Sequence, residues 1–295
     1  PYRHPIVGWM EDLETLTVDD ARLWYKTWYA PNNATLVVAG DVEAQDVFRL
    51  AKQYFGQLAT SRIPQLKPRR EAKQFGTKRV SVEVPAKIPY LIMGYKAPVL
   101  RRSIEDKDAV MADEWELYAL EVLAGVLDGG SSARLSNNLV RGQQIANSAS
   151  AGYGMTAKYE TLFTLSAVPN EGVAIEVLEF ALREEVNTIK NQLPDEAELD
   201  RVKAQVVAAQ VYQQDSTFYA AMEVGTLDTI GLPWQIKDEY VEKIMAVTAE
   251  QVQQVANKYL TDERLTVAVL DPLPINNKAE NETKVIPSAG TNDAD

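Results

Sequence analysis

The residue types that most often carry out enzyme chemistry are scarce in this sequence. There is one histidine, His4, and no cysteine among the 295 residues. Zinc sites use paired histidines or thiolates, and a Ser-His-Asp triad needs a firmly held histidine. His4 lies in a proline-rich stretch near the first residue, a poor place to hold an imidazole. The counts exclude disulfides, Fe–S clusters and a cysteine nucleophile, and they predict no complete catalytic centre in this stretch of sequence.

A glycine-rich segment at residues 127–134 (LDGGSSAR) is the next candidate for chemistry. Glycines that precede a helix N-terminus can bind anions, including phosphates. The segment lacks the Walker lysine and the G-x-G-x-x-G spacing that would indicate a nucleotide site. We therefore interpret it as a structural turn between two helices.

Tyrosine hydroxyls and carboxylates offer weaker candidates. A tyrosine more often packs its ring in the core and places its hydroxyl at the rim. Acidic pairs such as Glu184 and Glu185 are expected near helix ends, where they interact favourably with the helix dipole. The tyrosines that could contact a substrate are Tyr153, Tyr159, Tyr212 and Tyr219.

Composition describes an acidic globular protein. It is 46% hydrophobic and 24% charged, with a net charge of -12. The negative field disfavours a nucleic-acid partner. No apolar run approaches the roughly 18 residues of a membrane span. The sequence opens at Pro1 with neither an initiator methionine nor a signal-peptide pattern, so we expect a segment upstream of it.

One pattern occurs twice. Residues 17–29 predict a helix, and after Pro31 the segment 34–39 (ATLVVA) predicts a short buried strand, followed by a second helix at about 43–55. Residues 248–259 predict a helix with a capping box, and 265–270 (LTVAVL) a strand. The two segments align without gaps at an offset of 231 residues, with Thr17 on Thr248. This predicts two homologous modules, the first only partly present.

The region between the repeats predicts a linker and one complete module. Residues 60–78 contain prolines and many Lys and Arg without apolar periodicity, which indicates a solvated connector rather than an anionic docking patch. Alternating valines predict a strand at 78–84, with 89–95 as its partner strand. Further strands are expected at about 146–156 and 160–168. Expected helices are 113–127, a short one ending at Arg141, 172–191, 195–215, 217–230 and 234–245.

These elements predict an α+β fold: tandem homologous modules, each an antiparallel-rich sheet covered by helices. The expected divisions are 1–58 for the C-terminal part of the first module, 59–76 for the linker, 77–271 for the second module and 272–295 for a disordered tail. The tail is assigned because it contains little apolar material.

The opening residues carry a family resemblance. The stretches PYRHPIVGW at 1–9, DLETLT at 12–17 and WYKTWYAPNNATLVVAGD at 24–41 closely resemble the pitrilysin/insulinase family of zinc metallopeptidases. The similarity is dense over residues 1–58 and looser from about 75 to 271, where LDGGSSARL resembles a turn of that family's second homologous domain.

The resemblance implies tandem α/β domains of about 200 residues. It also implies that the first domain holds zinc through an inverted H-x-x-E-H motif and a further Glu, both upstream of the PYRH stretch. The zinc cofactor would belong to the full-length parent, where it would activate a water molecule with the motif Glu as general base. This chain lacks the motif, so we expect it to bind no metal, to contain no catalytic residue and to be inactive alone.

Two substrate-binding residues follow from the resemblance. Many family members use an Arg and a Tyr in a pattern like R-x-x-G-L-A-Y, and the corresponding stretch here is VRGQQIAN at 140–147. Arg141 fits the Arg position, whereas Asn147 stands at the Tyr position and cannot supply a phenol. Tyr153, six residues further along the expected strand, could reach the same face.

The sequence leaves two hypotheses of function. In the first, the chain is the later portion of a zinc metalloendopeptidase that cleaves extended or unfolded peptides, and it forms the closing half of the substrate chamber. In the second, it belongs to a non-catalytic scaffold or partner subunit of the same family. The expected partners are a peptide or unfolded protein, the missing N-terminal segment or a catalytic subunit, and a possible second copy. The expected location is periplasmic or secreted.

Overall fold

The computed structural model describes residues 4, 6–67, 72–101 and 112–275 of the 295-residue chain. The expected disordered tail at 272–295 lies mostly outside these residues. Part of the basic linker also lies outside them.

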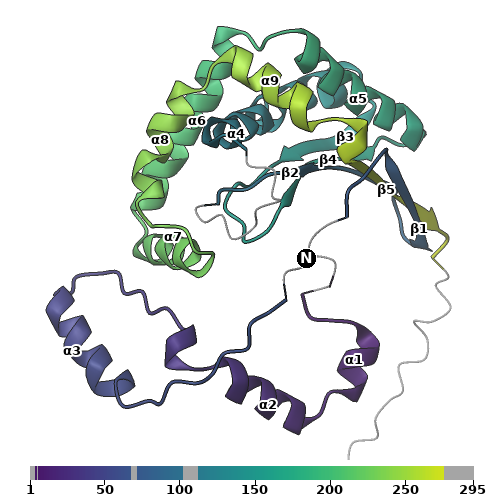
Figure 1. Ribbon diagram of the computed structural model, residues 1–295. Coiled ribbons are helices and arrows are strands. Elements are labelled where there is room, and N and C mark those ends of the chain that lie inside the picture. The colour runs from purple at the N-terminus through teal and green to yellow at the C-terminus, as the bar shows by residue number, and fades with distance from the viewer. Residues whose placement is uncertain (1–3, 5, 68–71, 102–111, 276–295) are drawn as a thin grey trace, which may run out of the picture.

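A five-stranded sheet forms the centre of the second module (Figure 1). Its strands are β1 (Lys78–Pro85), β2 (Tyr90–Ala97), β3 (Ala146–Gly152), β4 (Thr161–Pro169) and β5 (Leu265–Leu273). The spatial order is β1-β5-β2-β4-β3. β5 pairs in parallel with β1, and the other three pairings are antiparallel. The expected antiparallel-rich sheet of an α+β module is therefore confirmed.

The prediction that residues 89–95 pair with residues 78–84 is wrong. β5 lies between β1 and β2 and pairs with both strands. The six residues of β5 from Leu265 to Leu270 are apolar except for Thr266, which suits a strand with neighbours on both sides. Proximity in sequence indicated a hairpin, but β5, the last described strand of the module, takes the place between β1 and β2.

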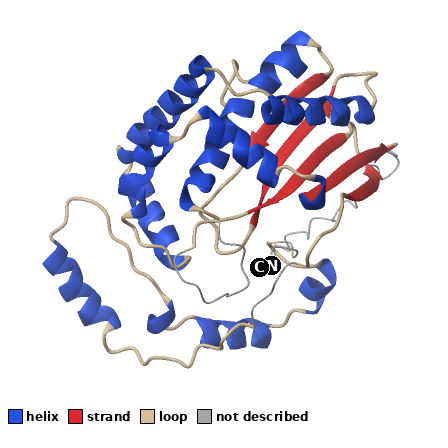
Figure 2. Cartoon of the chain, turned by 45° about the horizontal axis from the view of Figure 1, so that its top comes forward, coloured by secondary structure: helices blue, strands red, loops and turns tan. Residues whose placement is uncertain are grey.

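The two faces of the sheet differ in burial. Along β5 the side chains of Leu265, Val267 and Val269 are buried, and their register partners on β2 are buried as well. Helices cover this face (Figure 2). On the opposite face Val80, Val82 and the neighbouring strands expose apolar side chains, so among the described residues the sheet has one covered and one open face.

Helix α4 (Glu114–Asp128) is the most buried helix of the covering layer. It packs against α9 (Ala249–Tyr259), which also contacts α5 (Ile175–Asn191). Glu116 on α4 is only 3% exposed, and its carboxylate accepts hydrogen bonds from Lys258 Nζ at 2.5 Å and from the Tyr259 hydroxyl at 2.7 Å. These contacts compensate the buried charge and fix α9 on α4.

Three more helices complete the layer: α6 (Glu196–Gln214), α7 (Thr217–Thr229) and α8 (Ile236–Ala246). The expected helices in this region are confirmed to within a few residues. α6 crosses α4 closely at Gly125, where an added Cβ would lie 2.5 Å from Val202 Cγ1. The absence of a side chain at Gly125 allows this crossing. α7 is mostly exposed.

The N-terminal segment lies apart from the sheet as an arc of short helices (Figure 1). It contains α1 (Met10–Thr15), α2 (Val18–Trp28), the 3-10 turn η1 (Pro31–Asn33) and α3 (Ala44–Phe55). α2 and α3 confirm the expected helices, whereas α1 was not expected.

Residues 34–39 correct the prediction of a buried strand. The segment is not assigned as a strand and pairs with no described strand, and Leu36 is 59% exposed. A strand exists only with a neighbour that accepts and donates its backbone hydrogen bonds. The described residues place no such neighbour beside this segment.

We predict that Gly125→Ala lowers the free energy of unfolding by about 1–3 kcal/mol, because the methyl group overpacks against Val202. This loss outweighs the gain of about 1 kcal/mol in helix propensity. Urea denaturation measures the change. Gly225→Ala on α7 is the matched control, since its methyl group would meet Val37 at an ordinary 3.5 Å and should not destabilise. Equal urea midpoints for the two variants would contradict the packing argument.

Candidate functional site

The glycine-rich turn leads from α4 into an unusual helical segment. Gly130 has a φ of +88°, a conformation that favours glycine. The next helical segment, η2 (Ser136–Gly142), is a π-helix in which Gln143 N donates to Asn138 O at 2.7 Å. π-helical turns are rare and often occur at functional sites. The sequence led us to expect an ordinary short helix here.

Arg141 lies exposed near the end of η2. Its Nη2 donates to the Ser131 carbonyl and to Asn137 Oδ1, the latter at 2.8 Å. The guanidinium thus links η2 to the glycine-rich turn. Because Arg141 is exposed, it can also present donors to a carboxylate or a carbonyl oxygen.

A layer of polar side chains beneath η2 holds it in place. Asn138 donates to Glu185 Oε1 at 2.8 Å, and Arg134 makes a two-pronged ion pair with Glu198 at 2.6 and 2.7 Å. Burial raises the pKa of Glu185, whereas the hydrogen bond from Arg134 lowers the pKa of Glu198. Glu185 lies inside α5 and is 7% exposed. The expectation of a helix-end role for Glu185 is therefore wrong.

Tyr153 follows β3 and faces the covered side of the sheet. Its hydroxyl donates to the Pro98 carbonyl at 2.7 Å, and its ring stacks on Phe163 with centroids 6.3 Å apart. Burial raises the pKa of this hydroxyl. Asn147 is exposed at a register shift between Ala146 and Ser148. The expectation that residues 147 and 153 reach the same face assumed that side chains alternate regularly along the strand. The register shift breaks this alternation.

The structure places Arg141 and Tyr153 beyond opposite ends of β3 rather than side by side. Arg141 precedes β3 and Tyr153 follows it, and seven residues of extended strand span roughly 20 Å. The residues that sequence reasoning missed are Asn138 and Glu185. Glu185 falls on the apolar stripe of α5, between Leu182 and Ile189, and that position was the available signal for its burial.

The open face of the sheet exposes apolar side chains from several neighbouring strands. Val80, Val82 and Val84 of β1 are 47%, 43% and 38% exposed. β2 and β4 add Ile92 and Leu162. Towards β3 the face becomes polar, where the hydroxyls of Ser150 and Ser166 are 2.7 Å apart. β1 is an edge strand, so its outer backbone groups are in a position to pair with an extended chain.

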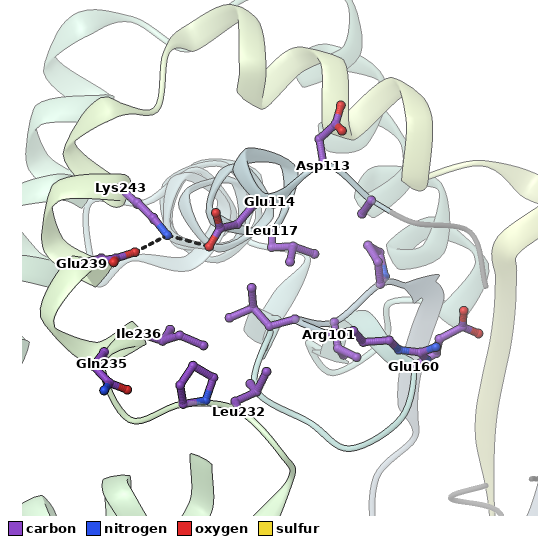
Figure 3. A pocket seen from close by; sticks show the side chains of 15 residues that line it. Arg101, Asp113, Glu114, Leu117, Glu160, Leu232, Gln235, Ile236, Glu239 and Lys243 are labelled. Atoms are coloured by element: carbon purple, nitrogen blue, oxygen red, sulfur yellow. Dashed lines mark hydrogen bonds and ion pairs between the residues drawn. The ribbon is translucent and has the colours of Figure 1, made fainter. Parts of the chain in front are cut away.

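A cavity of about 730 Å³ lies at the other side of the module, between the end of β2 and helices α4 and α8. In Figure 3, Lys243, Glu114 and Glu239 lie on one side and Arg101 and Glu160 on the other. Lys243 Nζ is 2.6 Å from Glu114 and 2.7 Å from Glu239. Among the described residues, the lining contains no histidine, serine or cysteine, so these residues offer binding contacts but no pair of nucleophile and base.

A half-buried carboxyl group, that of Glu121, joins α4 to α8. Glu121 accepts a hydrogen bond from the Tyr240 hydroxyl at 2.8 Å. Burial raises the pKa of Glu121 to about 7. The hydrogen bond from Tyr240 lowers the pKa but only partly offsets the burial.

A zinc ion does not fit the residues that the structure describes. Among residues 4, 6–67, 72–101 and 112–275, no group of three or more His, Cys, Asp or Glu side chains could hold a metal. His4 Nδ1 accepts a hydrogen bond from Trp9 Nε1 at 3.3 Å. Within the same ranges, no helix is long and apolar enough to cross a bilayer.

Sequence comparison identifies relatives over most of the chain. A family model described as the peptidase M16 inactive domain matches residues 15–206. The chain is 27% identical over 284 residues to a protein named zinc protease PqqE from Helicobacter pylori. The match covers 92% of this chain and 59% of that protein. A mitochondrial-processing peptidase subunit beta from Arabidopsis thaliana is 23% identical, with coverage of 96% and 53%.

Solved structures share the fold. A protease from Helicobacter pylori matches with a TM-score of 0.80 and 24% identity, over 90% of this chain and 62% of that one. A peptidase M16 inactive domain from Pseudomonas fluorescens gives a TM-score of 0.76 at 18% identity, over 94% and 63%. The chain thus spans about three fifths of the length of the matched zinc protease and of these two structures.

We predict that Glu121→Gln stabilises the protein increasingly as the pH rises from 4.5 to 7. The unfolded carboxyl ionises near pH 4.5, whereas the folded carboxyl keeps its proton up to about pH 7. The free energy of unfolding of the protein with Glu121 therefore falls as the pH rises through this window, whereas that of the glutamine variant does not change for this reason. The advantage of the variant should grow by about 1–3 kcal/mol, at roughly 1.4 kcal/mol per pKa unit. Urea titrations at several pH values measure it, and a pH-independent difference would contradict the assignment.

Proposed function

The chain belongs to the peptidase M16 family, in which it matches the inactive domain, and we propose that it is the later portion of a zinc metalloendopeptidase. In this proposal the chain forms the closing half of a substrate chamber and is inactive alone. Zinc and the general base would reside in the part of the parent that precedes residue 1. The substrate would be an extended or unfolded peptide.

The observation that carries the proposal is the open sheet face with its edge strand. A peptide that adds to β1 pairs its main chain with the strand regardless of sequence, which suits a protease acting on unfolded chains. By register, the strand residues on this face include no carboxylate: the face is apolar from Val80 to Ile92 and carries hydroxyls at Ser150 and Ser166. Arg141 would add a contact to a substrate carboxylate or carbonyl, and Tyr153 is the second expected contact.

A non-catalytic scaffold or partner subunit is the alternative function. The Arabidopsis relative is named as a subunit, so some related chains work in assemblies. The upstream sequence of the parent distinguishes the two proposals. An H-x-x-E-H motif there supports the peptidase, and its absence favours the scaffold.

We also propose a periplasmic or secreted location for the parent, and cell fractionation tests this location. A possible dimer is a further proposal, and sedimentation of the purified protein tests it.

We predict that the full-length parent binds one zinc per chain and cleaves an unfolded peptide, while residues 1–295 alone do neither. Elemental analysis and a fluorescence-quenched peptide measure the two properties. The reason is the lack of a ligand set in the described residues. Stoichiometric zinc bound by residues 1–295 would refute the proposal that the zinc ligands lie in the part of the parent that precedes residue 1.

We predict that Val82→Lys weakens binding of an unfolded apolar peptide to the parent by about tenfold. It places a charge on the open face, and tenfold corresponds to ~1.4 kcal/mol. Val82 is 43% exposed, so the fold should tolerate the change. Ser81→Lys is the matched control, because Ser81 is also exposed but points to the other face of the same strand. Equal losses in both variants would rule out the open face as the peptide surface.

A further inference from the structure

The cavity between the end of β2 and helices α4 and α8 has an apolar floor. Its volume of about 730 Å³ lies within the range of about 300–1,000 Å³ that is usual for small-ligand sites. In Figure 3, Leu117 and Leu232 lie between two groups of charged side chains. These leucines are only 3% and 5% exposed. A ligand that covers them should be apolar along its middle, because a polar group placed there would lose its hydration.

The charged group on the α8 side has more negative than positive charge. Lys243 Nζ lies 2.6 Å from Glu114 and 2.7 Å from Glu239, so one ammonium group faces two carboxylates. The same Nζ lies 5.5 Å from the centroid of the Tyr118 ring, which also attracts a cation. Lys243 is therefore held in place, and the two carboxylates keep an excess of one negative charge. A cationic group of a ligand would balance this charge.

The opposite side of the cavity presents a guanidinium group. Arg101 lies there, and no ion pair joins it to any of the 15 lining residues that Figure 3 draws. Glu160 lies on the same side but is exposed, so water screens its attraction for Arg101. Arg101 therefore has donors for a ligand carboxylate, which a guanidinium can bind through two parallel hydrogen bonds.

Hydrogen bonds fix the cavity wall that follows β2. The Tyr153 hydroxyl donates to the Pro98 carbonyl at 2.7 Å, and Leu100 N donates to the Met155 carbonyl at 2.9 Å. Pro98 and Leu100 both line the cavity. A wall that is fixed before binding has less conformational entropy to lose when a ligand enters. Tyr153 is thus a positioning residue of this wall.

We propose that this cavity binds a short apolar peptide with free termini. Its α-ammonium group would lie at Glu114 and Glu239, its α-carboxylate at Arg101, and its side chains on the apolar floor. A fatty acid has no cation for the two carboxylates, and an alkyl amine has no anion for Arg101. A single amino acid carries both charges on one carbon atom and cannot place them on opposite sides of the cavity.

This inference goes beyond the proposed function and does not rest on it. The cavity lies among helices of the covered side, whereas the surface proposed for unfolded substrates is the open face of the sheet. Short peptides with free termini are the kind of molecule that a peptidase releases. A parent without zinc or activity would refute the proposed function and leave this site unaffected.

Calorimetric titration of the 295-residue chain with the peptide Ala-Leu-Leu-Ala tests the proposal. We expect binding of the peptide with free termini, and binding at least about tenfold weaker when its amino end is acetylated or its carboxyl end is amidated. Tetraglycine with free termini should also bind at least about tenfold more weakly, because it lacks the apolar side chains. Absence of binding by Ala-Leu-Leu-Ala would overturn the proposal, and so would equal affinities for the free and the blocked peptides.

Substitutions at the two ends of the cavity assign each terminus to its partner. Arg101→Gln should weaken binding of the free peptide about tenfold and leave binding of the amidated peptide unchanged. Glu114→Gln should weaken binding of the free peptide and leave that of the acetylated peptide unchanged. The matched control is Glu176→Gln, because Glu176 is also an exposed acid in the first turn of a helix but does not line the cavity.

The outcome that contradicts this arrangement is additivity. If amidation still costs tenfold in the Arg101→Gln variant, the carboxylate does not lie at Arg101. The equivalent result for acetylation in the Glu114→Gln variant would exclude the ammonium group from Glu114. Both side chains are at least partly exposed, so the thermal midpoints of the variants should match that of the unsubstituted chain.

Discussion

The structure of the second module depends on β5 having a strand on each side. Among the described residues β5 is the last strand, and it pairs with β1, the first, and with β2. Its backbone groups are satisfied only when both neighbours are present, since a strand has no internal hydrogen bonds. The segment between β4 and β5 forms helices α5 to α9, and Glu116 on α4 holds α9, the helix before β5, through Lys258 and Tyr259. Contacts between segments far apart in the chain slow folding in general, so the pairing of β5 with β1 predicts slow folding of this sheet.

Sequence patterns predicted the helices and strands well because those signals are local. Capping boxes, glycine stops and apolar spacing placed α4, α5, α6 and α9 to within a few residues. The partner of β1 could not be predicted, because alternation tells which face of a strand is buried and not which strand lies beside it. The register shift at Asn147 and the π-helix around Arg141 likewise have no signature in a single sequence. Arg141 could be named only through the family resemblance, whereas Tyr153 was also one of four tyrosines named from residue type, and the chemistry of both stays a prediction.

The distribution of charge links the fold to its proposed use. The chain carries a net charge of -12, yet the strand residues of the open face contribute no carboxylate. Several acidic side chains instead hold helices together, as Glu116, Glu198 and Glu185 do. A sheet face free of acid can accept apolar segments without the cost of desolvating a carboxylate. By register Lys78 and Lys96 lie on the same face, so its charge is positive and it would accept acidic residues more readily than basic ones.

The repeated unit shows which parts of the structure are autonomous. α2 keeps the same length and capping box as α9 although its apolar stripe is exposed, because helical hydrogen bonds are satisfied within the helix. Among the described residues segment 34–39 is part of no sheet, because the hydrogen bonds of a strand require a second chain segment beside it. Residues 265–270 have strands on both sides and belong to β5, whereas residues 34–39 have no strand beside them among the described residues. The difference between the copies is therefore one of partners, since the local sequence signals are equivalent.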